Sequence, residues 1–386
     1  MKSWIEISAA RLAENLRAVQ SAVGSQVEVL PVVKANGYGH SAASVAPILV
    51  KAGAKWLGVD DAEEGARVRE ALQENSTRLL VMCGMELEDA PLMAQHGLTP
   101  VVWTVEHVAA MEKAARSVGH RLPVHLEIDT GMARQGATLE SGTGVELDKV
   151  LERLAASRWV SCEGVMSHLS SSEVSGSEIT VVQREKFAAA LERVVAAGVK
   201  PEFVHLGNSS AVDEGSTTPW VRDIAKKMHA RAMVRPGLAI YGDCLSTENK
   251  QGTLVSRLKP VMTWKTNVIG LREVGAGTTV GYGATFVAKG PMRLALLPVG
   301  YADGFRREAS SGVGDGWVRI AGSKASVVGR VSMNLTVVDV TEIPEATVGS
   351  EAVVLGEGVT ADDHARWAGT IPYEILCGVR GKFLVV

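Results

Sequence analysis

Short runs of β-branched and apolar residues alternate with amphipathic helical stretches through the first 235 residues of the chain. The first pair is the strand-like run VEVLPVVK, residues 27–34, followed by a helical pattern over residues 41–54. Seven more strand-like runs follow, and the last of them is AMVRPG, residues 232–237. Eight alternating strands and helices over roughly 210 residues predict a (β/α)8 barrel of the TIM type, with its chemistry at the C-terminal ends of the strands.

After about residue 240 the helical periodicity fades, and strand-like runs punctuated by glycines continue to the end of the chain. We therefore expect a barrel domain over residues 1–240 and a mostly β domain over residues 241–386. The opening SWIEIS also alternates apolar and polar residues, so residues 1–10 can add a strand to the second domain.

Composition narrows the kind of partner. Lysine and arginine number 40 against 43 aspartates and glutamates, and no long run of one sign offers a surface for nucleic acid or an anionic membrane. No signal peptide and no membrane-spanning run are recognised, so we expect a soluble, cytoplasmic protein that acts on a small molecule. The four cysteines are far apart, with no zinc-ligand spacing, and their apolar surroundings predict small buried residues in a reducing compartment.

Lys34 is the first candidate for chemistry. It follows an apolar strand directly and precedes the glycine-rich ANGYGH. An amine that apolar neighbours desolvate at a barrel mouth is available for a Schiff base, although a lone strand-end lysine is more often an ordinary surface residue. The residues that follow Lys34 decide between these interpretations.

The segment VVKANGYGH, residues 32–40, resembles the cofactor signature of the alanine racemase family, and further matches run through nearly the whole chain. The resemblance implies a pyridoxal 5'-phosphate (PLP) enzyme that uses no metal and works as a homodimer with shared active sites. It makes Lys34 the lysine that carries PLP and one catalytic base. It also makes Tyr38 a ligand of the cofactor phosphate.

The segment DTGMARQG, residues 129–136, resembles the loop of that family whose arginine contacts the cofactor's phenolic oxygen and the substrate carboxylate. That role falls on Arg134, whose guanidinium suits a planar anion. Many family members carry a carbamylated lysine seven residues upstream, where this chain has Glu127. A glutamate supplies the same negative charge without modification, so we expect Glu127 to orient Arg134.

Three later strand ends complete the cofactor site that the resemblance implies. His168 lies beside the pyridine ring, Ser209 binds phosphate and Arg235 faces the pyridine nitrogen. The remaining cofactor contacts are assigned to Asn208, Gly237 and Leu238. A guanidinium does not readily give up a proton, so the nitrogen stays largely unprotonated and the ring is a weaker electron sink, which favours racemisation over transamination.

The second domain offers the base for the opposite face of the substrate. Tyr282, in VGYGATF, matches the family's catalytic tyrosine, which comes from the other subunit. A phenol is a weak base at neutral pH, so positive charge from His168 and Arg235 must favour its anion. By resemblance Tyr301 and Tyr373 narrow the entrance, with Tyr373 also reaching the phosphate.

The segment GRVSMN, residues 329–334, resembles the strand whose methionine binds the substrate carboxylate, a role that falls on Met333. Relatives specific for alanine commonly have aspartate at the position of Asn334 and often cysteine at that of Ser332. The expected function is PLP-dependent interconversion of L- and D-alanine by Lys34 and the partner's Tyr282, which supplies D-alanine for peptidoglycan. A racemase of broader range, acting on serine, lysine and arginine, and a non-catalytic PLP-binding regulator stay open.

Overall fold

The computed structural model describes residues 2–74, 76–140, 146–245 and 252–386. Contacts divide these residues into two units, each described by itself: a barrel unit within residues 12–37 and 42–259, and a β unit of residues 2–11, 38–41 and 260–386. The barrel unit thus continues beyond residue 241. Residues beyond it stay with the barrel because Oδ1 of the buried Asp213 accepts hydrogen bonds from the backbone N–H groups of Leu254, at 2.7 Å, and Val255, at 2.9 Å.

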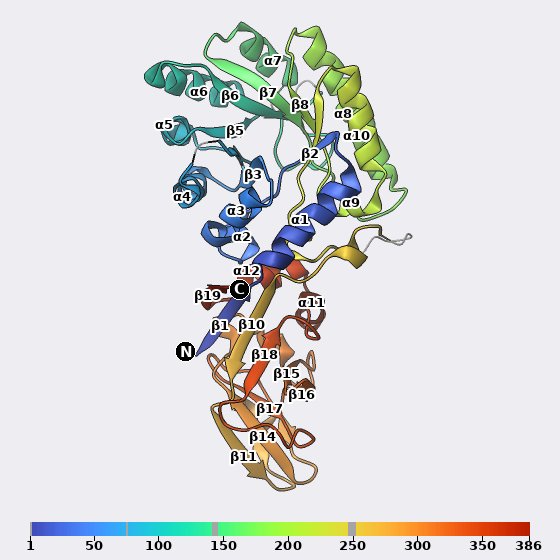
Figure 1. Cartoon of the computed structure of the whole chain (residues 1–386). Helices are drawn as coiled ribbons and strands as arrows, with labels where there is room; N and C mark the ends of the chain where they lie inside the picture. The colour runs from blue at the N-terminus through green and yellow to red at the C-terminus, as the bar shows by residue number, and fades with distance from the viewer. Residues whose placement is uncertain (1, 75, 141–145, 246–251) are drawn as a thin grey trace. The chain divides into compact units, whose positions relative to one another are not determined.

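The barrel unit is built on one sheet of parallel strands (Figure 1). In chain order the strands are β2 (Val27–Val29), β3 (Trp56–Val59), β4 (Arg78–Val81), β5 (Leu98–Val102), β6 (Leu122–Glu127), β7 (Val160–Met166), β8 (Phe203–His205) and β9 (Arg231–Val234). Their order in the sheet is β2-β9-β8-β7-β6-β5-β4-β3, and a parallel bridge between Val32 and Gly58 joins the two edges. This nearly closed eight-stranded barrel confirms the predicted fold class.

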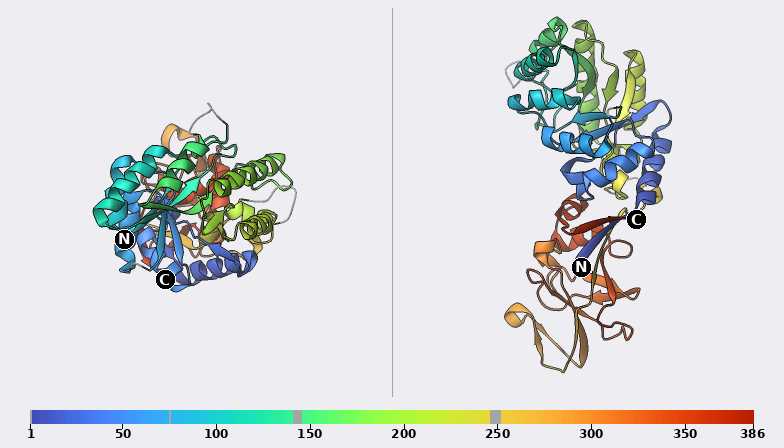
Figure 2. Two further views of the ribbon diagram at one scale, coloured as in Figure 1. Left: turned by 90° about the horizontal axis from the view of Figure 1, so that it is seen from above. Right: turned by 60° about the vertical axis from the view of Figure 1, so that its left-hand side comes forward.

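Helices lie outside the strands when the barrel is viewed from above (Figure 2). They are α1 (Ala9–Val23), α3 (Ala42–Lys51), α4 (Ala62–Leu72), α5 (Ala90–Gln95), α6 (Val105–Val118), α7 (Leu147–Ala156), α8 (Glu178–Ala196), α9 (Ser209–Glu214) and α10 (Thr217–Lys227). The short segment α2 (Lys34–Tyr38) contains left-handed residues and is a turn rather than a regular helix. Strands β3 and β5 are buried at every position, because helices cover one face and the barrel interior fills the other. This is why these strands read as unbroken apolar runs.

The β unit holds a six-stranded sheet of order β16-β15-β18-β10-β1-β19, a three-stranded sheet β11-β14-β17 and the hairpin β12-β13. Its strands are β1 (Ser3–Ile7), β10 (Met262–Asn267), β11 (Gly270–Val274), β12 (Thr279–Val280), β13 (Phe286–Val287), β14 (Met292–Leu297), β15 (Trp317–Ile320), β16 (Ser323–Ser326), β17 (Thr336–Asp339), β18 (Glu351–Leu355) and β19 (Lys382–Val385). The opening strand β1 pairs antiparallel with β10 and parallel with β19.

Two helices of the β unit, α11 (Ala361–Ala368) and α12 (Pro372–Gly378), were not expected from the sequence. Helix α11 begins with a capping box, in which Thr360 Oγ1 accepts from the backbone N–H of Asp363 and the Asp363 carboxylate accepts from that of Thr360.

No helix in the part of the chain that the structure describes is long and apolar enough to cross a membrane. The expectation that the cysteines are buried holds for Cys162 and Cys244 but is wrong for Cys83, which is exposed. Cys83 lies just beyond the end of β4, at the strand ends where a barrel opens.

Candidate active site

Lys34 begins a turn of unusual backbone conformation. Ala35, Asn36 and Gly37 have φ angles of 52°, 54° and 67°, in the left-handed region. A non-glycine residue there costs about 1 kcal/mol or more, so the turn persists only where its surroundings hold it.

The carboxylate that holds this turn belongs to Glu64 on α4. Oε1 of Glu64 accepts a hydrogen bond from the backbone N–H of Asn36 at 2.7 Å, and Oε2 accepts one from that of Asp60 at 2.8 Å. Glu64 is buried, and burial raises the pKa of its carboxyl while the two backbone hydrogen bonds lower it. Glu64 therefore joins the Lys34 turn to the segment that follows β3.

The amine of Lys34 lies at the end of β4. Its Nζ is 3.0 Å from Sγ of Cys83. Although Cys83 is exposed as a residue, partial enclosure of its sulfur disfavours the charged thiolate and raises the pKa of the thiol, while the positive charge of Lys34 opposes that rise. Cys83 is thus a neutral neighbour of the lysine rather than a thiolate.

The loop that carries Arg134 is organised by Asp129. Oδ1 of Asp129 accepts from the backbone N–H groups of Gly131 at 2.8 Å and Met132 at 3.0 Å. Gly136 closes the loop at φ +118°, where a Cβ would lie 2.5 Å from the backbone nitrogen of Asp129. Arg134 itself is exposed, which leaves its guanidinium accessible.

Glu127 ends β6 and is buried. Its carboxylate accepts a hydrogen bond from Nε2 of Gln135, which also donates to the carbonyl of Met82 at 2.9 Å. Burial raises the pKa of Glu127 to about 6, against the Gln135 hydrogen bond and the charges of Arg235 and Arg134. The direct partner of Glu127 is therefore Gln135, while Arg134 acts on it through its charge. Gln135 was missed, although it lies inside the DTGMARQG motif.

Arg235 follows β9 and is fully enclosed. Nη2 donates to the carbonyl of Ser167 at 2.7 Å and lies 3.3 Å from Nδ1 of His168. Burial lowers the pKa of Arg235 to about 10, so the guanidinium is charged at neutral pH. Its Nε is buried without a hydrogen-bond partner among the described residues. A buried N–H without an acceptor costs about 1–3 kcal/mol and marks a place where a ligand acceptor fits.

His168 carries no positive charge at neutral pH. Burial lowers its pKa to about 3, with further lowering by the charges of Arg235, Arg134 and Lys34. The expectation that His168 contributes positive charge is therefore wrong, whereas Arg235 does so. The physical reason is that burial disfavours the charged imidazole, and the neighbouring cations add to this effect.

Ser209 collects backbone donors from the segment after β9. Its Oγ accepts from the backbone N–H groups of Gly237 at 3.1 Å and Ala239 at 3.0 Å. Asn208 caps α9 by accepting from the backbone N–H of Ala211 at 3.0 Å. Leu238 begins the short 3-10 helix over Leu238–Tyr241. Backbone N–H groups converging beside a serine hydroxyl form a cradle that suits a phosphate.

In the β unit, the predicted aromatic residues fall in two places. The rings of Tyr38 and Tyr373 are 5.9 Å apart, so these two phosphate candidates are neighbours. The backbone N–H of Tyr301 donates to the carbonyl of Ser332 at 3.1 Å, which places Tyr301 beside the segment of Met333.

Asn334 donates from Nδ2 to Oδ2 of Asp303 at 3.3 Å. Asp303 also accepts from Nζ of Lys2 at 2.7 Å. The sequence assigns Asp303 no role, because its partners Lys2 and Asn334 lie 301 and 31 residues away in the chain.

Tyr282 follows Gly281, which has φ +77°, and its side chain is 71% exposed. Met333 is 57% exposed and Tyr301 43%. Large apolar and aromatic side chains this exposed are typical of a surface that meets another molecule.

Comparison with known proteins adds the family. The model of the alanine racemase N-terminal domain matches residues 7–244, and that of the C-terminal domain matches residues 261–385. The alanine racemase of Halothermothrix orenii is 34% identical over 383 residues, which cover 98% of this chain and 94% of that protein. The chain belongs to the alanine racemase family. It is thus an amino-acid racemase by sequence and by fold.

Solved structures of alanine racemases agree over the whole length. One, from a Streptomyces lavendulae that produces D-cycloserine, has a TM-score of 0.89 and 30% identity, covering 100% of this chain and 97% of that one. Another, from Bartonella henselae with covalently bound pyridoxal phosphate, has a TM-score of 0.83 and 25% identity, covering 100% of both chains.

The barrel residues of this alanine racemase family member fit PLP in two respects. The Nε of Arg235 lacks an acceptor, which a pyridine nitrogen supplies. The backbone N–H groups of Gly237 and Ala239 lie together beside the hydroxyl of Ser209, to which both donate, and a group of donors of this kind suits a phosphate. Among the described residues, no group of three or more His, Cys, Asp or Glu side chains is arranged to hold a metal ion.

Proposed function

We propose that the chain interconverts L- and D-alanine with PLP as a cytoplasmic homodimer, and that it supplies D-alanine for peptidoglycan. The buried, unpartnered Nε of Arg235 carries the proposal. An always-donating guanidinium fits a cofactor whose ring nitrogen accepts a hydrogen bond. The Bartonella henselae relative holds pyridoxal phosphate covalently.

Each residue of the site has a separate task. Lys34 would bind the cofactor covalently, Arg134 would contact its phenolic oxygen and the substrate carboxylate, and Arg235 would face its ring nitrogen. The phosphate would be held by Tyr38, Asn208, Ser209, Gly237, Leu238 and Tyr373. When bound, PLP supplies an electron-withdrawing ring that makes the Cα proton of an amino acid acidic.

Racemisation needs one proton removed from Cα and one returned on the opposite face. In our proposal Lys34 serves one face and Tyr282 of the partner subunit serves the other. Tyr282 is 71% exposed, which supports this assignment, because a base that acts in the partner's active site must project from the surface of its own subunit. Met333 of the partner subunit would bind the substrate carboxylate.

Circular dichroism of L-alanine solutions tests this function, because loss of optical activity follows racemisation directly. Lys34→Ala is expected to lose covalent PLP and racemisation, whereas the surface control Lys51→Ala keeps both. Tyr282→Phe removes only the hydroxyl and is expected to keep bound PLP while losing racemisation. Racemisation at the wild-type rate in either site variant would refute the two-base proposal, and bound PLP without turnover in the wild type would favour a non-catalytic regulator.

Substrate range is a second question, raised by Asn334. Asn334 has an uncharged amide, which donates a hydrogen bond to Asp303. The observation favours a broader racemase over a strict alanine enzyme. Rates for alanine, serine, lysine and arginine, compared between the wild type and Asn334→Asp, separate the two: a strict alanine enzyme would turn over alanine alone.

A further inference from the structure

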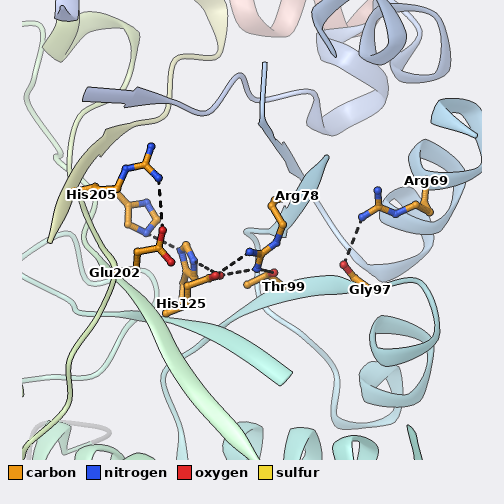
Figure 3. Close-up of polar contacts among 9 residues, drawn as sticks. Arg69, Arg78, Gly97, Thr99, His125, Glu202 and His205 are labelled. Carbon is orange, nitrogen blue, oxygen red and sulfur yellow. Dashed lines mark hydrogen bonds and ion pairs between the residues drawn. The ribbon is translucent and has the colours of Figure 1, made fainter. Parts of the chain in front are cut away.

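A chain of polar side chains runs through the barrel interior from Arg235. His205 Nδ1 lies 3.3 Å from Nη1 of Arg235, and His205 Nε2 lies 2.9 Å from Nδ1 of His125. Figure 3 shows the rings of His205 and His125 beside each other, with Arg78 near His125. His125 Nε2 lies 3.3 Å from Oε2 of Glu163, whose carboxylate accepts from Arg78 at 2.6 and 2.8 Å. Arg235 follows the end of β9, whereas Arg78 begins β4. The chain therefore connects the two ends of the barrel.

The end groups fix the direction of these hydrogen bonds. A guanidinium only donates and a carboxylate only accepts. Burial lowers the pKa of both His125 and His205, so each imidazole is neutral and has one donor and one acceptor nitrogen. The arrangement that satisfies every member has both histidines protonated on Nε2: Arg235 donates to His205, His205 to His125, and His125 to Glu163.

The position of the His125 ring is built into the strands. A Cβ on Gly164 would lie 2.5 Å from Nδ1 of His125, so only glycine leaves room for the ring on the neighbouring strand. The register between β6 and β7 shifts between Val124 and His125. Trp56 packs against the same ring, with the centroids 5.3 Å apart.

We propose that Glu163 and His125 are positioning residues, which hold the guanidinium of Arg235 by fixing the tautomer of His205. The inference rests on the proposed function, in which Arg235 faces the cofactor ring. Without the carboxylate, Arg78 would donate to Nε2 of His125, and the proton of His125 would move to Nδ1. The proton of His205 would then also move to Nδ1, so that the N–H of His205 and the N–H of Arg235 would face each other with no acceptor between them.

The tautomers are measurable by 15N NMR of the full chain labelled at histidine, with each signal assigned by substitution. Glu163→Leu is expected to move the proton of both His125 and His205 from Nε2 to Nδ1. Glu163→Gln keeps a carbonyl acceptor and is expected to leave both protons on Nε2. The matched control is Glu112→Leu, which removes a buried glutamate on α6 that is likewise paired with an arginine, Arg153. It is expected to leave both tautomers unchanged.

In the PLP-loaded enzyme, displacement of Arg235 is expected to shift the absorption band of the bound cofactor. Loss of one hydrogen bond to a charged group corresponds to a fall of about tenfold in kcat. KM is expected to stay within about twofold, because the substrate contacts lie elsewhere. Glu163→Gln, which keeps an acceptor but removes the charge, is expected to have the wild-type band. A role that depends on the negative charge alone would not explain that result.

Unchanged tautomers and an unchanged band in a folded Glu163→Leu variant would overturn the proposal. If that variant does not fold, Gly164→Ala tests the same link, since its methyl group displaces the His125 ring; wild-type His205 signals in a folded Gly164→Ala chain would equally overturn it. A wild type that does not racemise any amino acid would contradict the proposed function, while the tautomers of the full chain would still decide on the positioning role.

Discussion

Replacing Glu64 is expected to loosen the turn that carries Lys34. The carboxylate is 6% exposed and accepts from the backbone N–H groups of Asn36 and Asp60 at 2.7 and 2.8 Å. Each hydrogen bond to a charged group contributes about 1.5–3 kcal/mol, and the burial that raises the pKa of Glu64 offsets part of this. We therefore expect Glu64→Ala to lower the free energy of unfolding by about 3 kcal/mol, and Glu64→Gln, which keeps one acceptor, by about half of that.

The effect should reach the cofactor as well as stability. Ala35 and Asn36 occupy left-handed conformations that cost about 1 kcal/mol or more each, so the turn relaxes once Glu64 no longer holds it. Lys34 would then lose its fixed position. We expect PLP to bind more weakly to both variants, as measured by its absorption during titration.

Urea unfolding followed by circular dichroism measures the first effect. The control is Glu63→Gln on the same helix, where the side chain is exposed and forms an ion pair with Arg67 at 3.5 Å. A surface pair of this kind contributes about 0–1 kcal/mol, so the control should unfold close to the wild type. An unfolding midpoint of Glu64→Ala equal to that of Glu63→Gln would refute the reasoning.

Three further changes have defined outcomes. Because the pKa of Glu127 is raised to about 6, the folded chain holds this proton more tightly than the unfolded chain, and stability falls as pH rises from about 4.5 to 6. In urea unfolding, the free energy of unfolding of Glu127→Gln relative to the wild type should therefore rise by about 2 kcal/mol between pH 4 and pH 7. A difference that stays constant with pH would contradict the raised pKa. Ser209→Ala leaves the N–H groups of Gly237 and Ala239 without their acceptor and should weaken PLP binding about tenfold in an absorption titration, whereas Ser44→Ala should not. Gly136→Ala places a methyl group 2.5 Å from the Asp129 nitrogen at φ +118°, so the thermal midpoint of the variant should fall and the loop that carries Arg134 should change conformation. An unchanged midpoint would show that Gly136 does not fix this loop.

The barrel was predictable because each strand is a short apolar run between helical patterns, and parallel strands buried on both faces have that appearance. Strand β2 illustrates the limit. The run VEVLPVVK suggested a strand through residue 34, but β2 ends at Val29, and the chain then makes one bridge at Val32 before the left-handed turn. Local propensity does not reveal that turn, because a tertiary hydrogen bond from the backbone N–H of Asn36 to the Glu64 carboxylate stabilises it.

The candidate site divides in the same way. Residues in short motifs, such as Lys34 and Arg134, were found because their spacing is specific. Glu64 and Glu163 were missed because their partners lie far away in sequence: Asn36 is 28 residues from Glu64, and Arg78 is 85 residues from Glu163. Such residues can be recognised only when the fold has brought the strands together.

Charge balance around Arg235 links these missed residues to the site. An isolated buried cation is costly, yet Arg235 is buried and keeps its charge at neutral pH. Two carboxylates act on it from different sides: the buried Glu127 through its charge, and the partly buried Glu163 through the two neutral histidines. Glu163 forms its ion pair with Arg78, and the pKa of Glu127 is raised. Neither carboxylate forms a direct ion pair with Arg235, so neither turns the guanidinium away from a ligand acceptor. Nε of Arg235 is thus left as a fixed donor, which is the property that an acceptor on a ligand requires.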